Sequence, residues 1–275
     1  MKFNVLASGS KGNMTIIETE NTKVLLDVGI SMREAKKRTS EVLNDFDAII
    51  ISHEHTDHVR SLITFARQND AYIYINKESF DVVKKRFKDK VIGLKVKFIE
   101  ENTRYTIKDL NFLTLSLSHD THSCFGFIFF DKNTSLGYVT DTGFLPIPYI
   151  ELLKRVDSLI IESNHDVELL HDSDRPWMLK ERIFSVKGHM SNYICGQVLN
   201  SISSAGKIKL AVLAHLSEDC NTEELAVDTV LEAIEGEYIP RIIVARQNEA
   251  TGFWNVKSGE KIESKNQSKH SSISL

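Results

Sequence analysis

The chain has 275 residues, a hydrophobic fraction of 41 % and a formal net charge of −4. This composition excludes a chain that is disordered throughout, and the sequence holds neither a run of the roughly 18 apolar residues that a membrane span needs nor the apolar segment of a signal peptide. The acidic balance is unusual for a nucleic-acid-binding protein, but divalent cations would add positive charge that the sequence sum omits.

Strand-like and helix-like segments alternate from the first residues onward. Residues 48–51 form a continuous apolar run, which is typical of a strand buried on both faces, and an apolar stripe of helical period follows over 59–66. We predict strands over 2–7, 14–18, 23–27, 48–51, 72–75, 96–99, 104–107, 111–117, 125–130, 136–140, 158–162, 210–214 and 241–245. We predict further helices over 78–88, 148–155, 191–203 and 222–235.

Two groups of strands with helices between and after them predict an α/β fold, a four-layer αββα sandwich. A doubly wound parallel sheet is the alternative, but the chain lacks the GxGxxG and GxxxxGK[ST] signatures that would favour it. We expect one domain over 1–257 and a polar, mobile tail over 258–275. The three cysteines contain no CxxC pair, so we expect buried thiols without disulfides, as suits a cytoplasmic protein.

The segment His53-Glu54-His55-Thr56-Asp57-His58 carries the strongest chemical signal in the chain. Zinc and similar ions favour imidazole nitrogen and carboxylate oxygen, and this loop supplies both between a buried strand and a helix. Four ligands from one loop cannot all reach one ion with good geometry. The loop therefore indicates two ions, which need further ligands from elsewhere in the chain.

Three such ligands each follow a predicted apolar strand. His119 comes after 112–118, Asp141 after 136–140 and His215 after 210–214. Strand ends present side chains on a rigid support, and three residues in the same setting favour a shared site over three unrelated loop residues.

This pattern resembles the metallo-β-lactamase superfamily over about residues 2–246. The resemblance implies that His53, His55 and His119 hold the first metal, that Asp57, His58 and His215 hold the second, and that Asp141 bridges both. It also implies that Asp27 braces the loop of residues 53–58, here called the metal loop, through hydrogen bonds without touching a metal. The expected cofactors are two divalent ions, Zn²⁺ or Mn²⁺, with iron as a further option.

Longer motifs resemble the YycJ/WalJ group of bacterial metallo-hydrolases within that superfamily. They are 7–13, 162–166, 187–192, 214–217 with Asn221, and 245–247. This resemblance implies a two-metal nuclease with 5′-directed exonuclease action on DNA. The expected chemistry is attack on phosphorus by a metal-bridging hydroxide, with Asp57, Glu162 and His189 as catalytic residues.

Glu162 and His189 are expected to form a proton-relay dyad, as the corresponding residues do in the similar tRNase Z and β-CASP nucleases. The alternative is a bystander His189 next to Ser191, which would cap a helix. Ser191, Ser217 and His165 are candidates for holding the substrate phosphate.

Two other functions stay open on the sequence alone. One is hydrolysis of small esters, lactones or thioesters, which uses the same hydroxide on a carbonyl. The other is a metal-stabilised binding protein, against which the surplus of polar groups around the ligands argues. The basic clusters at 36–38 and at 84–90 are interpreted as solvated helix faces rather than phosphate tracks.

Overall fold

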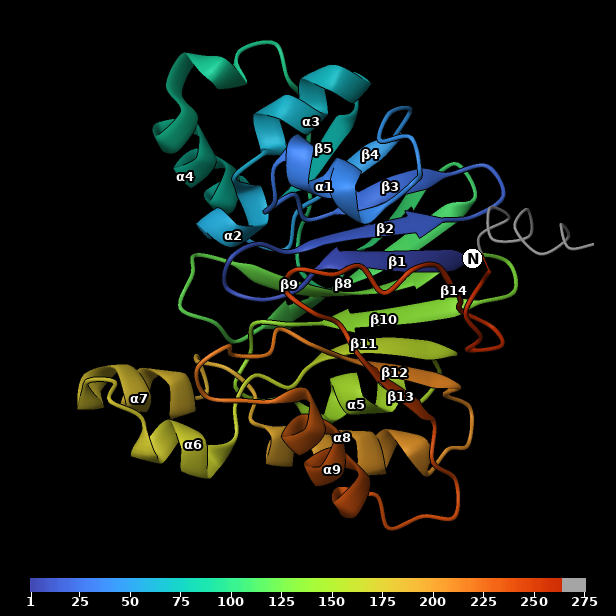
Figure 1. The fold of residues 1–275 in the computed structure, drawn as a ribbon. Coiled ribbons are helices and arrows are strands. Elements are labelled where there is room, and N and C mark those ends of the chain that lie inside the picture. Colours follow the sequence, from blue (N-terminus) through green and yellow to red (C-terminus); the bar gives the residue numbers. More distant parts are fainter. Residues whose placement is uncertain (264–275) are drawn as a thin grey trace, which may run out of the picture.

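The computed structural model describes residues 1–263, which form two seven-stranded sheets packed face to face (Figure 1). In spatial order the first sheet contains β14 (Trp254–Asn255), β1 (Lys2–Ala7), β2 (Met14–Glu18), β3 (Lys23–Leu26), β4 (Ala48–Ile50), β5 (Tyr72–Ile75) and β6 (Lys95–Phe98). The second contains β13 (Arg241–Val244), β12 (Leu210–Ala214), β11 (Ser158–Glu162), β10 (Ser135–Val139), β9 (Cys124–Phe130), β8 (Leu110–Leu117) and β7 (Arg104–Ile107).

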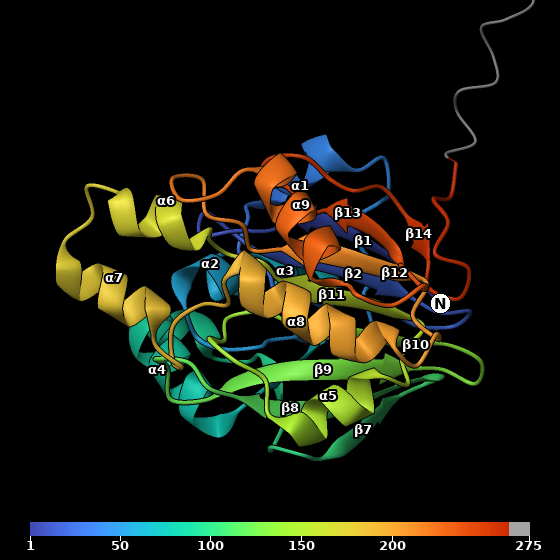
Figure 2. The same ribbon diagram turned by 90° about the horizontal axis from the view of Figure 1, so that it is seen from below.

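Helices cover the outer face of each sheet, and the predicted αββα sandwich is confirmed. The first sheet carries α1 (Met32–Arg38), α2 (Thr56–Val59), α3 (Leu62–Asn69), α4 (Lys77–Phe87) and the 3₁₀ turn η1 (Lys88–Val91). The second carries α5 (Ile147–Leu153), α8 (Asn192–Ser203) and α9 (Glu223–Ala233), as Figure 2 shows from below. A short arm of α6 (Val167–Asp172) and α7 (Trp177–Phe184) projects beside them.

The core consists of three apolar layers, one at each boundary between neighbouring layers of the sandwich. One lies between the sheets and includes Phe112, Phe127 and Val212. The other two lie between each sheet and its own helices. Strands β4 and β12 are buried along their whole length and are continuously apolar rather than alternating. β11 is buried as well and is apolar between its end residues Ser158 and Glu162.

The sequence did not predict α1, α6 and α7. Each is short and buries only one or two side chains, so its apolar residues make no periodic stripe. α6 is instead started by Asp166, whose carboxylate accepts from the backbone N–H groups of Glu168 and Leu169.

The expected tail begins inside the described part of the chain. The Ile262 N–H donates to the carbonyl of Phe253 at 2.7 Å, and Arg241 donates to the carbonyl of Gly259 at 3.2 Å. Residues 258–262 are thus joined to the sheet edge, whereas 264–275 lie outside the described residues. All three cysteines are buried thiols without a disulfide, as expected. No helix within residues 1–263 is long and apolar enough to cross a membrane.

The ends of several strands meet at one edge of the sandwich and carry the candidate site. Asp27 follows β3, the metal loop follows β4, and Asp141 and His215 follow β10 and β12. Asp27, Asp141 and His215 have positive φ angles of 56°, 60° and 56°. Left-handed backbone is unfavourable for residues with a Cβ atom, so its recurrence at three site residues shows that each strand turns sharply where its side chain is needed.

Candidate active site

The metal loop carries its imidazoles between β4 and the first turn of α2. His53 and His58 are buried and His55 is half-buried. The backbone of the loop is fixed by the turn after β1, because the Asn13 N–H donates to the carbonyl of Asp57 at 2.7 Å. A Cβ on Gly29 would lie 1.5 Å from that same carbonyl, so this position requires glycine.

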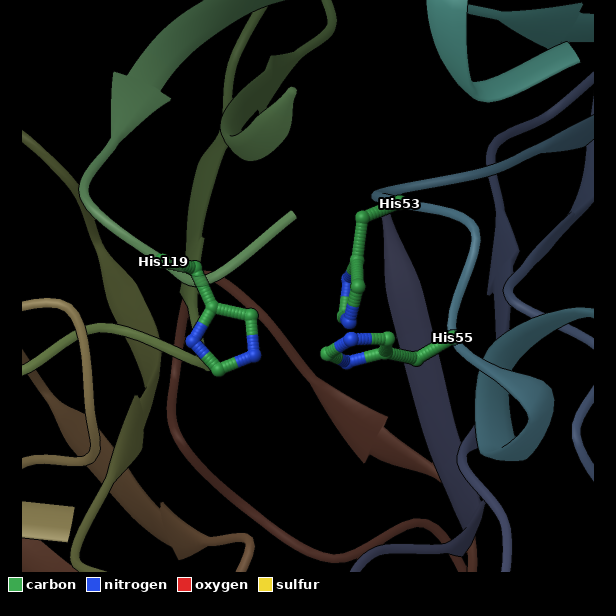
Figure 3. A group of neighbouring side chains, drawn as sticks. All are labelled: His53, His55 and His119. Atoms are coloured by element: carbon green, nitrogen blue, oxygen red, sulfur yellow. The ribbon is translucent and has the colours of Figure 1, made fainter. Parts of the chain in front are cut away.

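The residues proposed for the first metal lie together. Ligand atoms of His53, His55 and His119 all lie within 4.8 Å of one another. In Figure 3, His53 and His55 come from the metal loop and His119 from the opposite sheet, and the three rings turn toward one common space. The two sheets thus each supply part of one group.

The residues proposed for the second metal lie together as well. Ligand atoms of Asp57, His58 and His215 form a second group within the same 4.8 Å limit. Asp141 joins the two groups, since it clusters with His53 and His58 on one side and with His215 on the other. These seven residues are therefore arranged as two adjacent donor sets that share one carboxylate.

Several ligand atoms in these sets are buried and have no hydrogen-bond partner among residues 1–263. They are Nε2 of His53, Nε2 of His215 and Oδ2 of Asp141. Buried polar atoms are almost always paired, and three orphans aimed into one space fit divalent cations with nitrogen and oxygen ligands.

The charges around the two donor sets also fit bound divalent cations. Burial and neighbouring imidazoles hold the pKa of His53 well below its ordinary value, so its ring is neutral, as a metal ligand must be. Burial also opposes charge on His58, but Asp27, Asp57 and Asp141 outweigh it and raise that pKa well above the ordinary value. The surplus of buried carboxylates at the second set is what a cation would neutralise.

Asp27 lies directly behind the metal loop and is fully buried. Its Oδ1 accepts from the Ser52 N–H at 2.9 Å, and its Oδ2 accepts from Nδ1 of His58 at 2.8 Å. This bond fixes the tautomer of His58 and leaves its Nε2 facing Asp57 and Asp141 at 3.3 and 3.4 Å.

Replacing Asp27 with alanine should lower metal affinity about 10- to 100-fold, because His58 loses the partner that orients it. Competition against a chromophoric chelator measures the affinity. Asp27→Asn is the matched control, since asparagine tolerates the positive φ and keeps an acceptor for Ser52 but cannot accept from both donors. We expect an intermediate loss in that variant. Unchanged affinity in Asp27→Ala would refute the bracing role.

Glu162 ends β11 and is fully buried beside the second donor set. Its Oε1 accepts from Nδ1 of His189 at 2.7 Å and from Nδ1 of His215 at 3.0 Å. Its Oε2 accepts from the backbone N–H groups of Thr142 at 2.9 Å and Met190 at 3.2 Å. With both oxygens engaged in this way, Glu162 is placed to orient imidazoles rather than to bind a metal.

The charge on Glu162 is stabilised by the same neighbours. Burial alone would raise its pKa, but His189 and His215 outweigh burial and hold the pKa well below its ordinary value. In return Glu162 overcomes the effect of burial on His189 and raises the pKa of that imidazole. The pair is thus a carboxylate with an imidazole that favours its protonated form.

A cavity of about 170 Å³ lies beside His189. Its lining includes His119, His189 and His215 from the sheet side and Arg175 and Arg182 from the arm. The side chain of Arg182 forms an ion pair with Asp120, and Arg175 pairs with Asp219 at 2.8 Å. The cavity therefore has imidazoles at its floor and guanidinium groups at its rim.

The three candidates for phosphate binding are placed differently. Ser217 lines the cavity, and its hydroxyl accepts from the Cys220 N–H at 3.1 Å. The Ser191 hydroxyl accepts from the Ile194 N–H at 3.3 Å and so caps α8. His165 is buried against Phe184, with ring centroids 5.4 Å apart, and burial lowers its pKa to about 4. Of the three, Ser217 is the one that lines the cavity.

Sequence reasoning missed three residues that hold the donor sets and the metal loop in place. Asn13 donates to Oδ2 of Asp57 at 3.1 Å, and Ser8 Oγ accepts from the His215 N–H at 2.8 Å. Both lie in the turn after β1, within the 7–13 motif, from which no individual contact could be inferred. The third is Glu54, whose carboxylate accepts from Nδ1 of His122 at 2.9 Å and from Ser79 at 2.7 Å. Its place between two metal-loop histidines was the available signal.

Comparison with known proteins gives consistent similarities. Residues 22–216 match the family model of the β-lactamase superfamily domain. The chain is 33 % identical to exodeoxyribonuclease YycJ of Bacillus anthracis, over 86 % of this chain and 89 % of that protein. It is 32 % identical to exodeoxyribonuclease WalJ of Streptococcus pneumoniae, over 85 % and 88 %. The crystal structure of the metallo-β-lactamase fold protein YhfI from Bacillus subtilis superposes with a TM-score of 0.69 at 17 % identity, covering 90 % of this chain and 98 % of that one.

Proposed function

Because the chain belongs to the metallo-β-lactamase superfamily and is a metal-dependent hydrolase, we propose that it hydrolyses phosphodiester bonds in DNA, as a 5′-to-3′ exonuclease. The observation that carries the proposal is the Glu162–His189 pair, held at 2.7 Å beside the donor sets. Two relatives that share about a third of their aligned positions with this chain are named exodeoxyribonucleases, which supports DNA as the substrate.

Two donor sets would hold two cations. The first set is His53, His55 and His119, the second is Asp57, His58 and His215, and Asp141 would bridge them. When bound, the cations lower the pKa of water and offset the negative charge that builds up on the phosphate oxygens.

His189 is suited to act as the general acid. Its Nδ1 is engaged by Glu162, so its Nε2 is the nitrogen left to face the cavity, and the Glu162 carboxylate raises its pKa and so favours the protonated imidazole. When the bond between phosphorus and the leaving oxygen breaks, Nε2 can give its proton to that oxygen. The Glu162 carboxylate keeps the ring in place and stabilises its charge during the transfer.

The rim of the cavity suits a phosphate group. Arg175 and Arg182 line the cavity, and guanidinium groups bind phosphate oxygens through two parallel hydrogen bonds. A phosphate would compete with Asp120 and Asp219 for them. Ser217 adds a hydroxyl at the same wall. These groups are more useful to a phosphodiesterase than to an enzyme that attacks a neutral carbonyl, which favours the proposal over hydrolysis of esters, lactones or thioesters.

The test uses linear duplex DNA labelled at either end and a closed circular duplex, each with Mn²⁺. We expect mononucleotides from the 5′ label, an intact circle and no activity in Asp141→Asn, which loses the bridging carboxylate. Equal cutting of the circle would make the enzyme an endonuclease. Rapid hydrolysis of a lactone or thioester without any DNA cleavage would establish the rival function.

A further inference from the structure

The last turn of α4 and the adjoining η1 form a basic ridge, defined as Lys84, Lys85, Arg86, Lys88 and Lys90. All five side chains are exposed. With Asp89 between them, the ridge has a formal charge of +5 − 1 = +4, on a chain whose total is −4. Positive charge is thus concentrated on one short stretch of an acidic protein.

Within the described residues, the five cationic groups of the ridge form no ion pair. The other basic cluster behaves differently, because Lys37 pairs with Glu34 at 2.8 Å and Arg38 donates to the carbonyl of Gln247 at 2.8 Å. The 36–38 cluster is therefore partly engaged within the protein, whereas the four lysines of the ridge keep their charge available to a partner.

The ridge is connected to the metal loop through Glu54. Nη1 of Arg86 donates to the Glu54 carbonyl at 3.1 Å, and Ser79, at the other end of α4, donates to the Glu54 carboxylate at 2.7 Å. Glu54 lies between His53 and His55 in the chain. The helix thus begins at the edge where the metal ligands gather and extends away from it, beside α2 in Figure 1.

From this placement we infer that the basic ridge is the surface along which a nucleic-acid strand runs, outside the two-metal centre. The inference rests on the proposed function. The sugar–phosphate backbone of a nucleic acid carries negative charges at regular spacing. Exposed lysines on a fixed helix can neutralise several of them without recognising the base sequence. The overall acidity of the protein then confines binding to this side of the molecule.

The test compares two triple variants that remove the same charge. Lys84→Gln/Lys85→Gln/Lys88→Gln alters the ridge and leaves Arg86, which contacts Glu54, in place. Arg33→Gln/Lys36→Gln/Lys132→Gln is the control, because these three side chains are exposed and form no ion pair among residues 1–263. Each metal-loaded protein is titrated into a fluorescent duplex with phosphorothioate linkages, which resist cleavage, at several salt concentrations. Thermal unfolding verifies that each variant folds.

We expect the ridge variant to bind on the order of tenfold or more weakly at 0.1 M salt, and its slope of log Kd against log salt to fall by about two to three. The control should retain the wild-type slope. Equal slopes in the two variants would overturn the inference. It would also be overturned if the ridge variant kept the DNA binding of the wild type and instead lost binding to phosphatidylserine vesicles, measured in a parallel titration.

The outcomes distinguish failure of the proposed DNA-binding role of the ridge from failure of the proposed nuclease function. A wild-type protein that binds DNA through the ridge but cleaves none would leave this inference standing and remove the proposed function. A protein that cleaves DNA with the same Michaelis constant in both triple variants would do the reverse. Absence of both binding and cleavage would remove both.

Discussion

Replacing Asp57 with asparagine is expected to empty the second metal position and to lower kcat roughly a thousandfold, since several kcal/mol of charge stabilisation are lost with the ion. Asp57 is placed with His58 and His215 in one donor set, and its Oδ2 lies 3.3 Å from Nε2 of His58. Burial would raise its pKa, but these imidazoles outweigh burial and hold the pKa well below its ordinary value. Asparagine removes the charge and keeps the shape.

Metal analysis and steady-state kinetics on the same sample measure both effects. Asp219→Asn is the matched control, because Asp219 is an exposed carboxylate that pairs with Arg175 at the rim. It should keep two metals and lose little activity. Two metals and a near-native rate in Asp57→Asn would show that Asp57 is not a ligand.

Replacing His189 with glutamine is expected to lower kcat on DNA by about 10²- to 10⁴-fold, which is the usual contribution of a general acid. The loss should depend on the leaving group. The alkoxide released from DNA needs a proton, whereas 4-nitrophenolate leaves without one, so the same variant should hydrolyse bis(4-nitrophenyl) phosphate at a rate close to wild type. Glu162→Gln should lower the rate on both substrates and weaken metal binding, because Glu162 orients the proposed ligand His215 as well as His189.

His171→Gln is the control for this prediction, since His171 is an exposed histidine paired with Asp172 on the arm. The metal content of the His189 variant should remain two. Equal losses on both substrates would mean that His189 acts through the metals or the fold rather than as a proton donor.

The clustering of the seven candidate ligands could be predicted from the sequence because their signals are local. Three histidines and an aspartate fall within six positions, and His119, Asp141 and His215 each follow an apolar strand by one or two residues. Strand periodicity needs no knowledge of distant contacts, so the two-sheet architecture was accessible as well.

Some supporting contacts could not be predicted, because they join distant parts of the chain. Asn13 and Asp57 are 44 residues apart, and Glu54 and His122 are 68 apart. The arm was missed because its helices bury little apolar surface. The role of the ridge depends on which lysines find an acidic partner, and that is decided by the fold.

The most direct test of the account is a titration of metal-free protein with Mn²⁺, in which bound metal and phosphodiester hydrolysis are followed together. If two donor sets share Asp141 and act as one centre, binding should saturate at two ions per chain, and most of the activity should appear with the second. Saturation at one ion per chain with full activity would contradict the two-metal site, and so would full activity of the metal-free protein.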